Sequence, residues 1–200
     1  MQTAGYKTEN LLRKNGALLV AGIDEVGRGA LAGPLVAGVV ILPKHSRLKL
    51  CDSKLISAHR REELDYLVKE KAVGYGLGWV TNTEIDTFGL AWSLREAYLR
   101  ALEEMNLEVS QVILDGSMNY LADFDMCQTR VKADRDVACV AAASILAKVA
   151  RDEYMHRLCD QYPQYCYETN VGYGTKVHTE AIRKHGLTDL HRKSFCSNFI

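Results

Sequence analysis

The chain has 200 residues, of which 48% are hydrophobic and 25% are charged, and its formal net charge at pH 7 is zero. This length supports one hydrophobic core and is too short for two comfortable domains, so we expect a single domain over residues 1–200. No run approaches the roughly 18 apolar residues of a membrane span, and the polar segment 1–14 lacks the apolar core of a signal peptide. The six cysteines form no Cys-x-x-Cys pair, which favours reduced thiols in the cytoplasm over a disulfide framework or a zinc site.

Positive charge is concentrated in two stretches despite the neutral total. Residues 43–61 hold six basic residues against one acidic residue, and residues 170–200 hold five against two. A neutral chain argues mildly against binding of nucleic acid through bulk electrostatics. Most such runs are solvated surface, but both stretches could contact phosphates.

The predicted elements begin with two β-strands around a glycine-rich turn. Apolar, β-branched residues at 18–24 and 35–42 predict the strands, which the segment 25–34 joins. The first strand therefore ends at Asp24, and Glu25 begins the turn.

A helix, a strand and a second helix follow. Residues 60–72 have helical periodicity, and residues 73–80 alternate glycine with Tyr, Leu and Trp in the manner of a third strand. We predict a long amphipathic helix over about 84–105, with Thr83 as its N-cap.

The second half of the chain places two more carboxylates after strands. Residues 111–114 predict a short buried strand that stops at Asp115, and residues 126–132 predict another that stops before Asp134. The alanine-rich segment 137–157 predicts a helix that packs tightly on the sheet.

One more helix is predicted at about 179–185, ended by Gly186. Strands that come first as a block and then alternate with helices predict a mixed sheet covered by helices, an α/β fold.

Four carboxylates are predicted at the ends or exits of different strands: Asp24, Glu25, Asp115 and Asp134. Placed together they would repel and raise one another's pKa unless cations neutralised them. Oxygen ligands without a histidine or cysteine pattern favour Mg²⁺ or Mn²⁺ over zinc, and two such ions can promote phosphodiester hydrolysis. By spacing alone, solvated strand-end acids are the commoner explanation, because 25 acidic residues guarantee some at strand ends.

The segment 21–34, AGIDEVGRGALAGP, resembles the opening signature of ribonuclease HII, the type 2 ribonucleases H. Further segments match this family in the same order: 52–54 (DSK), 114–116 (LDG), 131–134 (VKAD), 142–152 (AASILAKVARD), 172–175 (GYGT) and 191–195 (HRKSF). Together the matches span residues 21–195, which makes a chance origin negligible.

The resemblance implies a ribonuclease H-like mixed sheet flanked by helices. The core would occupy about 17–160, and a helical C-terminal extension at about 161–200 would contribute to substrate binding. The family's four metal-binding acids match Asp24, Glu25, Asp115 and Asp134. These would therefore hold two Mg²⁺ or Mn²⁺ ions in a monomeric enzyme.

The resemblance also implies substrate-binding residues. Gly27, Arg28 and Gly29 match the motif that senses the ribose 2′-hydroxyl, which separates RNA from DNA, and grips the flanking phosphate. Tyr173 matches the tyrosine that packs on the sugar next to the scissile junction, and Lys54 matches a lysine near the substrate backbone.

The implied activity is hydrolysis of the RNA strand of RNA–DNA hybrids and of single ribonucleotides embedded in duplex DNA, leaving 3′-hydroxyl and 5′-phosphate ends. Such an enzyme would serve DNA replication and repair in the cytoplasm. Two other classes stay open: a catalytically silent nucleic-acid-binding module, against which four intact acids argue, and a phosphatase or ATPase on a related sheet.

Three positions depart from the family's usual pattern without removing a metal ligand. Asn170-Val171 stands where His-Lys is frequent, Leu55 replaces a second lysine, and Ala141 replaces a frequent serine. The first departure removes an expected positive contact with substrate.

Among the remaining residues, the six histidines share no metal-ligand spacing and are predicted at the surface or in local hydrogen bonds. Trp79, Trp92 and Tyr98 are predicted to be core or half-buried side chains.

Overall fold

The computed structural model describes residues 3–199, so the predicted domain bounds 1 and 200 lie outside the described residues. Its centre is a five-stranded sheet of order β3-β2-β1-β4-β5. The strands are β1 (Val20–Val26), β2 (Leu35–Ile41), β3 (Gly74–Val80), β4 (Gln111–Asp115) and β5 (Cys127–Arg130). β1, β2 and β3 pair antiparallel, whereas β4 runs parallel to β1 and β5 parallel to β4. The predicted mixed sheet is confirmed.

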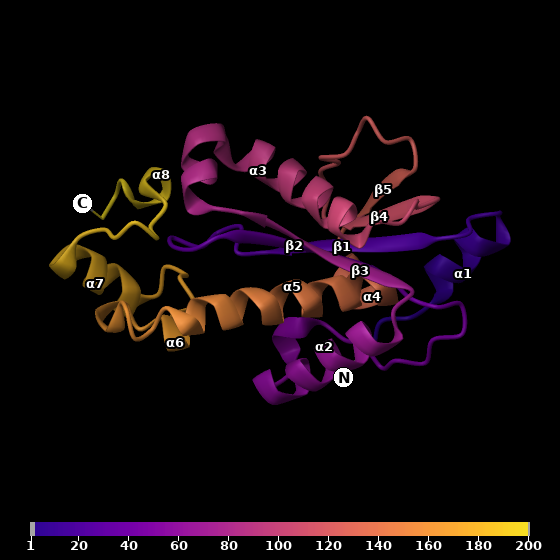
Figure 1. Ribbon diagram of the computed structural model, residues 1–200, viewed down its shortest axis with the longest axis horizontal. Helices are drawn as coiled ribbons and strands as arrows, with labels where there is room; N and C mark the ends of the chain where they lie inside the picture. The colour runs from indigo at the N-terminus through magenta and orange to yellow at the C-terminus, as the bar shows by residue number, and fades with distance from the viewer. Residues whose placement is uncertain (1–2, 200) are drawn as a thin grey trace.

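Helices cover both faces of this sheet (Figure 1). α3 (Asn82–Met105) packs on one face, and α5 (Ala138–Arg157) packs on the other, with α2 (Ala58–Lys71) outside it. Glycines in the strands allow this close approach: a Cβ at Gly22 would collide with the backbone of α5, and one at Gly78 with the backbone of α3. The tight packing predicted for the alanine-rich helix is therefore confirmed.

The predicted N-cap of the long helix is wrong by two residues. Thr81 is the N-cap: its hydroxyl accepts from the Glu84 N–H, and the Glu84 carboxylate accepts from the Thr81 N–H in a capping box. Thr83 lies inside the first turn, and the helix is interrupted at Gly89, where φ is +80°. The first strand also lies two residues further along than predicted. β1 runs from Val20 to Val26, so Glu25 lies inside the strand and not in the turn, whereas Leu18 lies outside the sheet and is 84% exposed.

Short elements without a sequence prediction connect the main ones. They are α1 (Lys7–Lys14), η1 (Ser53–Leu55), α4 (Ala133–Asp136), η2 (Pro163–Tyr165), α6 (Tyr167–Asn170) and α8 (Lys193–Cys196). The predicted final helix is α7 (Lys176–His185), which begins earlier than expected, after Thr175 as its N-cap, and ends at Gly186. η2, α6, α7 and α8 lie beyond the end of α5 as a helical extension with its own hydrophobic cluster (Figure 1).

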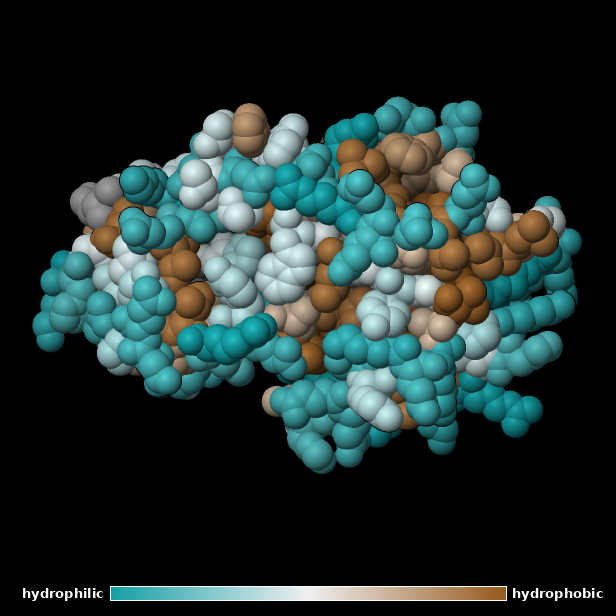
Figure 2. Space-filling view, in the orientation of Figure 1, coloured by the Kyte–Doolittle hydropathy of each residue, from teal (hydrophilic) through white to brown (hydrophobic). Residues whose placement is uncertain are grey.

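Hydrophilic residues cover α2 and α7 on the face shown in Figure 2, and hydrophobic residues show between the two helical layers. Within residues 3–199, no helix is both long and apolar enough to cross a bilayer.

Candidate metal centre and substrate pocket

Three of the four predicted acids converge beside the ends of β1 and β4. One carboxylate oxygen from each of Asp24, Asp115 and Asp134 lies within 4.8 Å of the others. Asp24 and Asp115 meet because β1 and β4 are parallel neighbours. Asp134 lies in α4, which is held against β4 because the Ala133 N–H donates to Asp115 Oδ1 at 2.6 Å. The predicted convergence is therefore present for three of the four acids, and Asp134 reaches it from a helix and not from a strand exit.

The electrostatics of this cluster favour a bound cation. Burial raises the pKa of Asp24 well above its usual range, and the charges of Glu25, Asp115 and Asp134 raise it further, against a hydrogen bond from Ser144. Burial and the Asp115 charge also raise the pKa of Asp134. Clustered, desolvated carboxylates are costly unless a cation neutralises them, and an all-oxygen donor set fits a hard divalent ion such as Mg²⁺ or Mn²⁺.

Glu25 lies at the edge of this cluster, and its carboxylate is held from the α3 side. The Tyr98 hydroxyl donates to Glu25 Oε2 at 2.6 Å, and Arg28 Nη1 lies 3.8 Å from Glu25 Oε1. Burial raises the pKa of Glu25, whereas the Tyr98 hydrogen bond lowers it. Tyr98 is buried, as predicted, but its contact with an acid of the site was missed. The sequence holds no signal for it, because only the packing of α3 across β1 brings the two together.

A pocket of about 320 Å³ opens beside the acids and brings two predicted substrate-binding residues to them. Its lining consists of Glu25, Val26, Ser53, Lys54, Ser144, Lys148 and Tyr173. Lys54 Nζ lies 3.7 Å from Asp134 Oδ2. Burial alone would lower the pKa of Lys54, but the charges of four surrounding acids, led by Asp24 and Asp134, together outweigh it and raise that pKa. The pocket thus has one carboxylate, two lysines and an aromatic ring, which suits a sugar-phosphate ligand.

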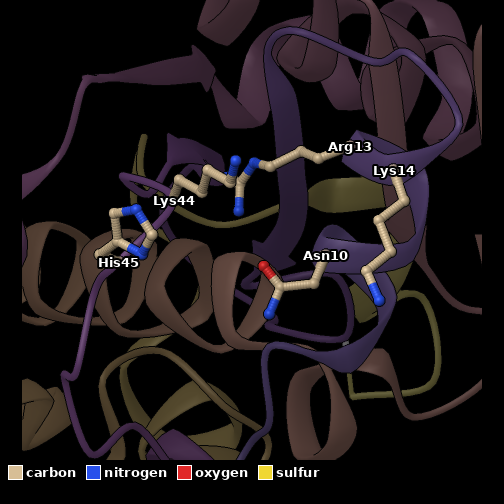
Figure 3. A pocket seen from close by; sticks show the side chains of 5 residues that line it. All are labelled: Asn10, Arg13, Lys14, Lys44 and His45. Carbon is tan, nitrogen blue, oxygen red and sulfur yellow. The ribbon is translucent and has the colours of Figure 1, made fainter.

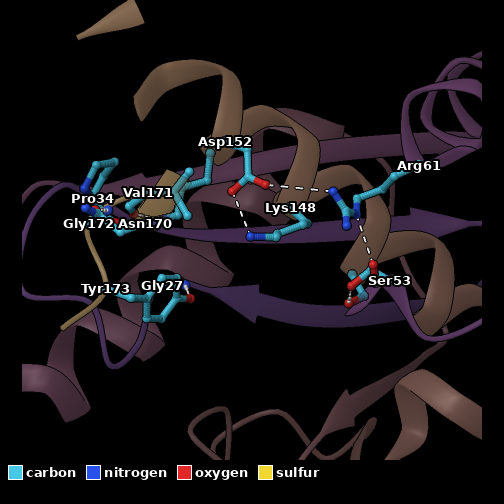
Figure 4. A network of polar contacts seen from close by, with 12 residues as sticks. Gly27, Pro34, Ser53, Arg61, Lys148, Asp152, Asn170, Val171, Gly172 and Tyr173 are labelled. Carbon is cyan, nitrogen blue, oxygen red and sulfur yellow. Dashed lines mark hydrogen bonds and ion pairs between the residues drawn. The ribbon is translucent and has the colours of Figure 1, made fainter. Parts of the chain in front are cut away.

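The glycine-rich turn contributes one structural glycine and one open position. The Gly27 N–H donates to the Tyr173 hydroxyl at 3.1 Å (Figure 4). Gly27 has φ +86°, and a Cβ there would collide with the Arg151 side chain, so only glycine fits. No atom stands within 4 Å of a Cβ built at Gly29, and the Arg28 side chain is 53% exposed. Arg28 and Gly29 therefore face open space.

A chain of polar contacts, missed in the sequence, supports the other side of the pocket (Figure 4). Asp152 lies 2.8 Å from Lys148 Nζ and 3.9 Å from Arg61 Nη1. Arg61 Nε donates to the Ser53 carbonyl at 3.0 Å, and the Ser53 and Ser144 hydroxyls are 3.0 Å apart. The helical spacing of Ser144 and Lys148 within the matched segment 142–152 was the available signal, because it places both on one face of α5.

Two buried histidines fix the backbone that carries Tyr173. His178 Nδ1 lies 2.9 Å from the Tyr173 carbonyl oxygen, which can only accept, so this nitrogen carries the proton. His178 Nε2 then accepts from His191 Nε2, 3.2 Å away, and His191 Nδ1 accepts from the Thr188 N–H. One pair of neutral tautomers satisfies every contact, so the local hydrogen bonding predicted for histidines is confirmed here.

This pair predicts a stability that depends on pH. Burial and the neighbouring His178 lower the pKa of His191 to about 4, and burial lowers that of His178. An unfolded histidine has a pKa of about 6.5, so the unfolded chain binds more protons between pH 6.5 and 4. The contribution of the two neutral histidines to the free energy of unfolding is therefore fully present above pH 6.5 and is lost as the pH falls toward 4.

Urea-unfolding midpoints between pH 7.5 and 5 check this prediction. The double variant His178→Gln, His191→Gln should lose stability at pH 7.5 and show a weaker further loss at pH 5 than the wild type. The exposed-histidine variant His59→Gln should keep the wild-type dependence. An unchanged pH dependence in the double variant would contradict the prediction.

The family model and a sequence relative agree on one family. The family model described as Ribonuclease HII matches residues 21–198. A ribonuclease HII of Staphylococcus carnosus is 44% identical over 189 residues, which are 94% of this chain and 71% of that protein. In structure, ribonuclease H2 from Pyrococcus horikoshii has a TM-score of 0.78 at 24% identity, covering 91% of this chain and 97% of its own.

Another solved protein, Bst-RNase HIII in complex with Mn²⁺, has a TM-score of 0.66 at 20% identity, covering 87% of this chain and 65% of its own. The two structural similarities show that the predicted ribonuclease H-like fold is correct.

Proposed function

Because this chain belongs to the ribonuclease HII family, whose members are endoribonucleases acting on RNA–DNA hybrids, we propose that it also cuts at single ribonucleotides embedded in duplex DNA. The products would be 3′-hydroxyl and 5′-phosphate ends. The observation that carries the proposal is the convergence of Asp24, Asp115 and Asp134 within 4.8 Å, next to a pocket whose Lys54 pairs with Asp134.

Asp24, Asp115 and Asp134, with Glu25 at their edge, would hold two Mg²⁺ or Mn²⁺ ions. Bound there, such ions supply Lewis-acid stabilisation of the phosphate and activate the attacking water. The protein's own groups place these carboxylates: Tyr98 fixes Glu25, and Lys54 reduces the repulsion around Asp134. No side chain is needed as general base.

Discrimination of RNA from DNA would come from Arg28, Gly29 and Tyr173. The hydrogen bond from Gly27 to Tyr173 joins the glycine-rich turn to the aromatic ring. A sugar packed on the ring would therefore lie beside the open backbone at Gly29, where a 2′-hydroxyl can be tested. Arg28, more than half exposed, can reach the adjacent phosphate.

Asn170, where the family often has histidine, has a structural role. Its amide donates to the Tyr165 carbonyl at 2.6 Å and its carbonyl accepts from the Gly172 N–H at 2.8 Å. This side chain is buried, so it shapes the turn that leads to Tyr173 without contacting substrate. The positive charge of the family's His-Lys pair, which Asn170-Val171 replaces, is missing here, and its absence would weaken substrate affinity without affecting catalysis.

We also propose that residues 1–200 act as one catalytic domain, in which a core at about 17–160 carries the acids and the extension at about 161–200 contributes Tyr173. The working state would be a monomer in the cytoplasm, acting in ribonucleotide removal during DNA replication and repair.

The test is cleavage of an end-labelled DNA duplex that contains one ribonucleotide, with Mg²⁺, Mn²⁺ or EDTA. We expect a metal-dependent cut on the 5′ side of the ribonucleotide, a cut in the RNA of a hybrid, and none in an all-DNA duplex. A folded protein that binds these duplexes without cutting any would support the binding module instead, and removal of a terminal phosphate alone would support a phosphatase.

A further inference from the structure

The hollow between α1 and the segment that follows β2 contains only uncharged or basic side chains. It is a pocket of about 340 Å³ lined by Asn10, Arg13, Lys14, Lys44 and His45 (Figure 3). Arg13 and Lys44 extend into it from opposite sides, and Asn10 and Lys14 lie along its rim. Because the lining has no carboxylate, we propose that this pocket binds a backbone phosphate of a nucleic-acid duplex, away from the acidic centre. The inference rests on the proposed nucleic-acid substrate.

The charge of this pocket is not neutralised by the protein. Among residues 3–199, neither Arg13, Lys14 nor Lys44 forms an ion pair. The one acid of α1, Glu9, is fully buried, and its Oε1 accepts from the Cys139 N–H at 2.9 Å. An external anion would therefore meet three cations without a competing carboxylate at the pocket.

The Arg13 guanidinium is held in place at the end of β2. Its Nη2 donates to the Leu42 carbonyl at 2.7 Å, which anchors the guanidinium at the end of β2. Its Nη1 is buried and has no hydrogen-bond partner within the described part of the chain. Because Nη1 is shielded from solvent, a phosphate in the pocket would interact with the charge of the guanidinium and not with this nitrogen.

A purely structural role accounts for only part of this arrangement. Arg13 and Lys14 lie in the last turn of α1, where positive charge is favourable beside the negative end of the helix dipole. That role needs neither Lys44 nor His45, which come from a different segment, and it needs no concave surface. The cations from two segments around one hollow are better explained by a shared anion.

The position of the pocket fits a duplex more than a small phosphorylated ligand. Asp24 pairs with Gly38 across the sheet, and Lys44 lies six residues beyond Gly38 in the same segment. At ~3.3 Å per extended residue, with about 5 Å more across the Asp24–Gly38 pair, the Cα of Lys44 lies at most about 25 Å from that of Asp24. A duplex presents phosphates at ~3.4 Å per strand along its axis, so about seven base pairs cover this distance. Lys44 also begins the basic stretch 43–61.

The proposal can be tested without cleavage by measuring how tightly the protein binds an all-DNA duplex in EDTA. Fluorescence anisotropy between 50 and 200 mM KCl gives the binding constant at each salt concentration. Lys44→Gln should weaken binding about fivefold at the lower salt and reduce the slope of log K against log salt by about one. In the cleavage assay it should raise KM and leave kcat unchanged. Lys71→Gln, which removes an exposed lysine with no ion pair in the described chain from the end of α2, is the matched control.

A second variant separates binding from folding. Arg13→Lys keeps the charge but not the guanidinium that is anchored on the Leu42 carbonyl, so it should also weaken binding, and thermal midpoints will show whether α1 remains docked. An unchanged salt slope in Lys44→Gln, equal to that of Lys71→Gln, overturns the proposal. Stabilisation of the wild type by inorganic phosphate with no change in duplex binding by Lys44→Gln also overturns it, in favour of a small phosphorylated ligand. If Lys44→Gln reduces the salt slope but the wild-type protein cuts none of the duplexes, the phosphate site is supported and the proposed hydrolysis is refuted.

Discussion

Asp24→Asn and Asp134→Asn should each lower cleavage of the ribonucleotide-containing duplex by roughly a thousandfold or more. The acids would hold the divalent ions, and a catalytic metal supplies several kcal/mol of transition-state stabilisation, in which ~4 kcal/mol corresponds to three orders of magnitude. Asparagine keeps the size of the side chain and removes its charge. Cleavage rates in Mg²⁺ and Mn²⁺ at pH 8 give the measurement.

The two variants that lose cleavage should not lose stability, and they should be at least as stable as the wild type. Burial and neighbouring acids raise the pKa of Asp24 and of Asp134, so their charged forms are disfavoured in the folded chain and a neutral amide relieves that cost. We expect urea-unfolding midpoints equal to or above wild type in EDTA. Asp125→Asn, at an exposed acid, is the control for both measurements. Near wild-type cleavage by Asp24→Asn would rule out the metal centre, and a large loss of stability would mean that the acids have a structural role.

The strand-end acids show what the sequence can predict. Apolar runs ending at Asp24 and Asp115 locate two buried strands, and the parallel pairing of neighbouring strands then brings the two carboxylates to one edge. The roles of Arg28 and Tyr173 came from resemblance to a family, since nothing in a glycine-rich turn or a single tyrosine specifies a nucleic-acid sugar. The sequence predicts only that Tyr98 belongs to the core, because helical periodicity places a side chain on one face of a helix but does not identify its polar partner.

The wrong N-cap has a local physical cause. Thr81 with Glu84 and Thr83 with Asp86 both have the spacing of a capping pair, so the sequence allows two starts. Tertiary structure decides between them. β3 continues to Val80, which leaves Thr81 as the first residue free to cap, and the Asp86 carboxylate accepts instead from the Lys193 and Ser194 N–H groups of the extension.

The short helices were missed because segments of four to eight residues have little helical stability alone. α4 illustrates this: its N-cap, Lys132, has φ +60° and no side-chain cap, and the turn is held by the bond from Ala133 to Asp115. α4 therefore depends on the carboxylate that shares its site. The junction between the core and the extension likewise depends on tertiary contacts, and the buried side chain of Arg151 bonds to both parts.

Arg151→Met should lower the free energy of unfolding by at least ~3 kcal/mol. Arg151 is fully buried, and its guanidinium donates to the carbonyls of Pro34 at 2.8 Å, Val171 at 2.8 Å and Ala32 at 3.0 Å. Methionine fills much of the volume but leaves three buried acceptors without donors, each worth ~1–3 kcal/mol. Relief of the cost of burying the cation, which lowers the pKa of Arg151, offsets only part of this loss.

The same variant should also weaken substrate binding, because Arg151 ties the turn after β1 to the segment that carries Tyr173 and lies 5.3 Å from the centre of its ring. Arg151→Lys keeps the charge, but one ammonium cannot reproduce the planar fork to three carbonyls, so it should recover less than half of the lost stability. Arg157→Met, at an exposed arginine of the same helix, is the matched control and should unfold within ~0.5 kcal/mol of wild type. Urea unfolding and KM for the duplex are the two readouts. Wild-type stability in Arg151→Met would mean that water satisfies the three carbonyls, and the extension would then be held to the core by its hydrophobic cluster and the second buried arginine, Arg192, which donates to the Gly33 carbonyl.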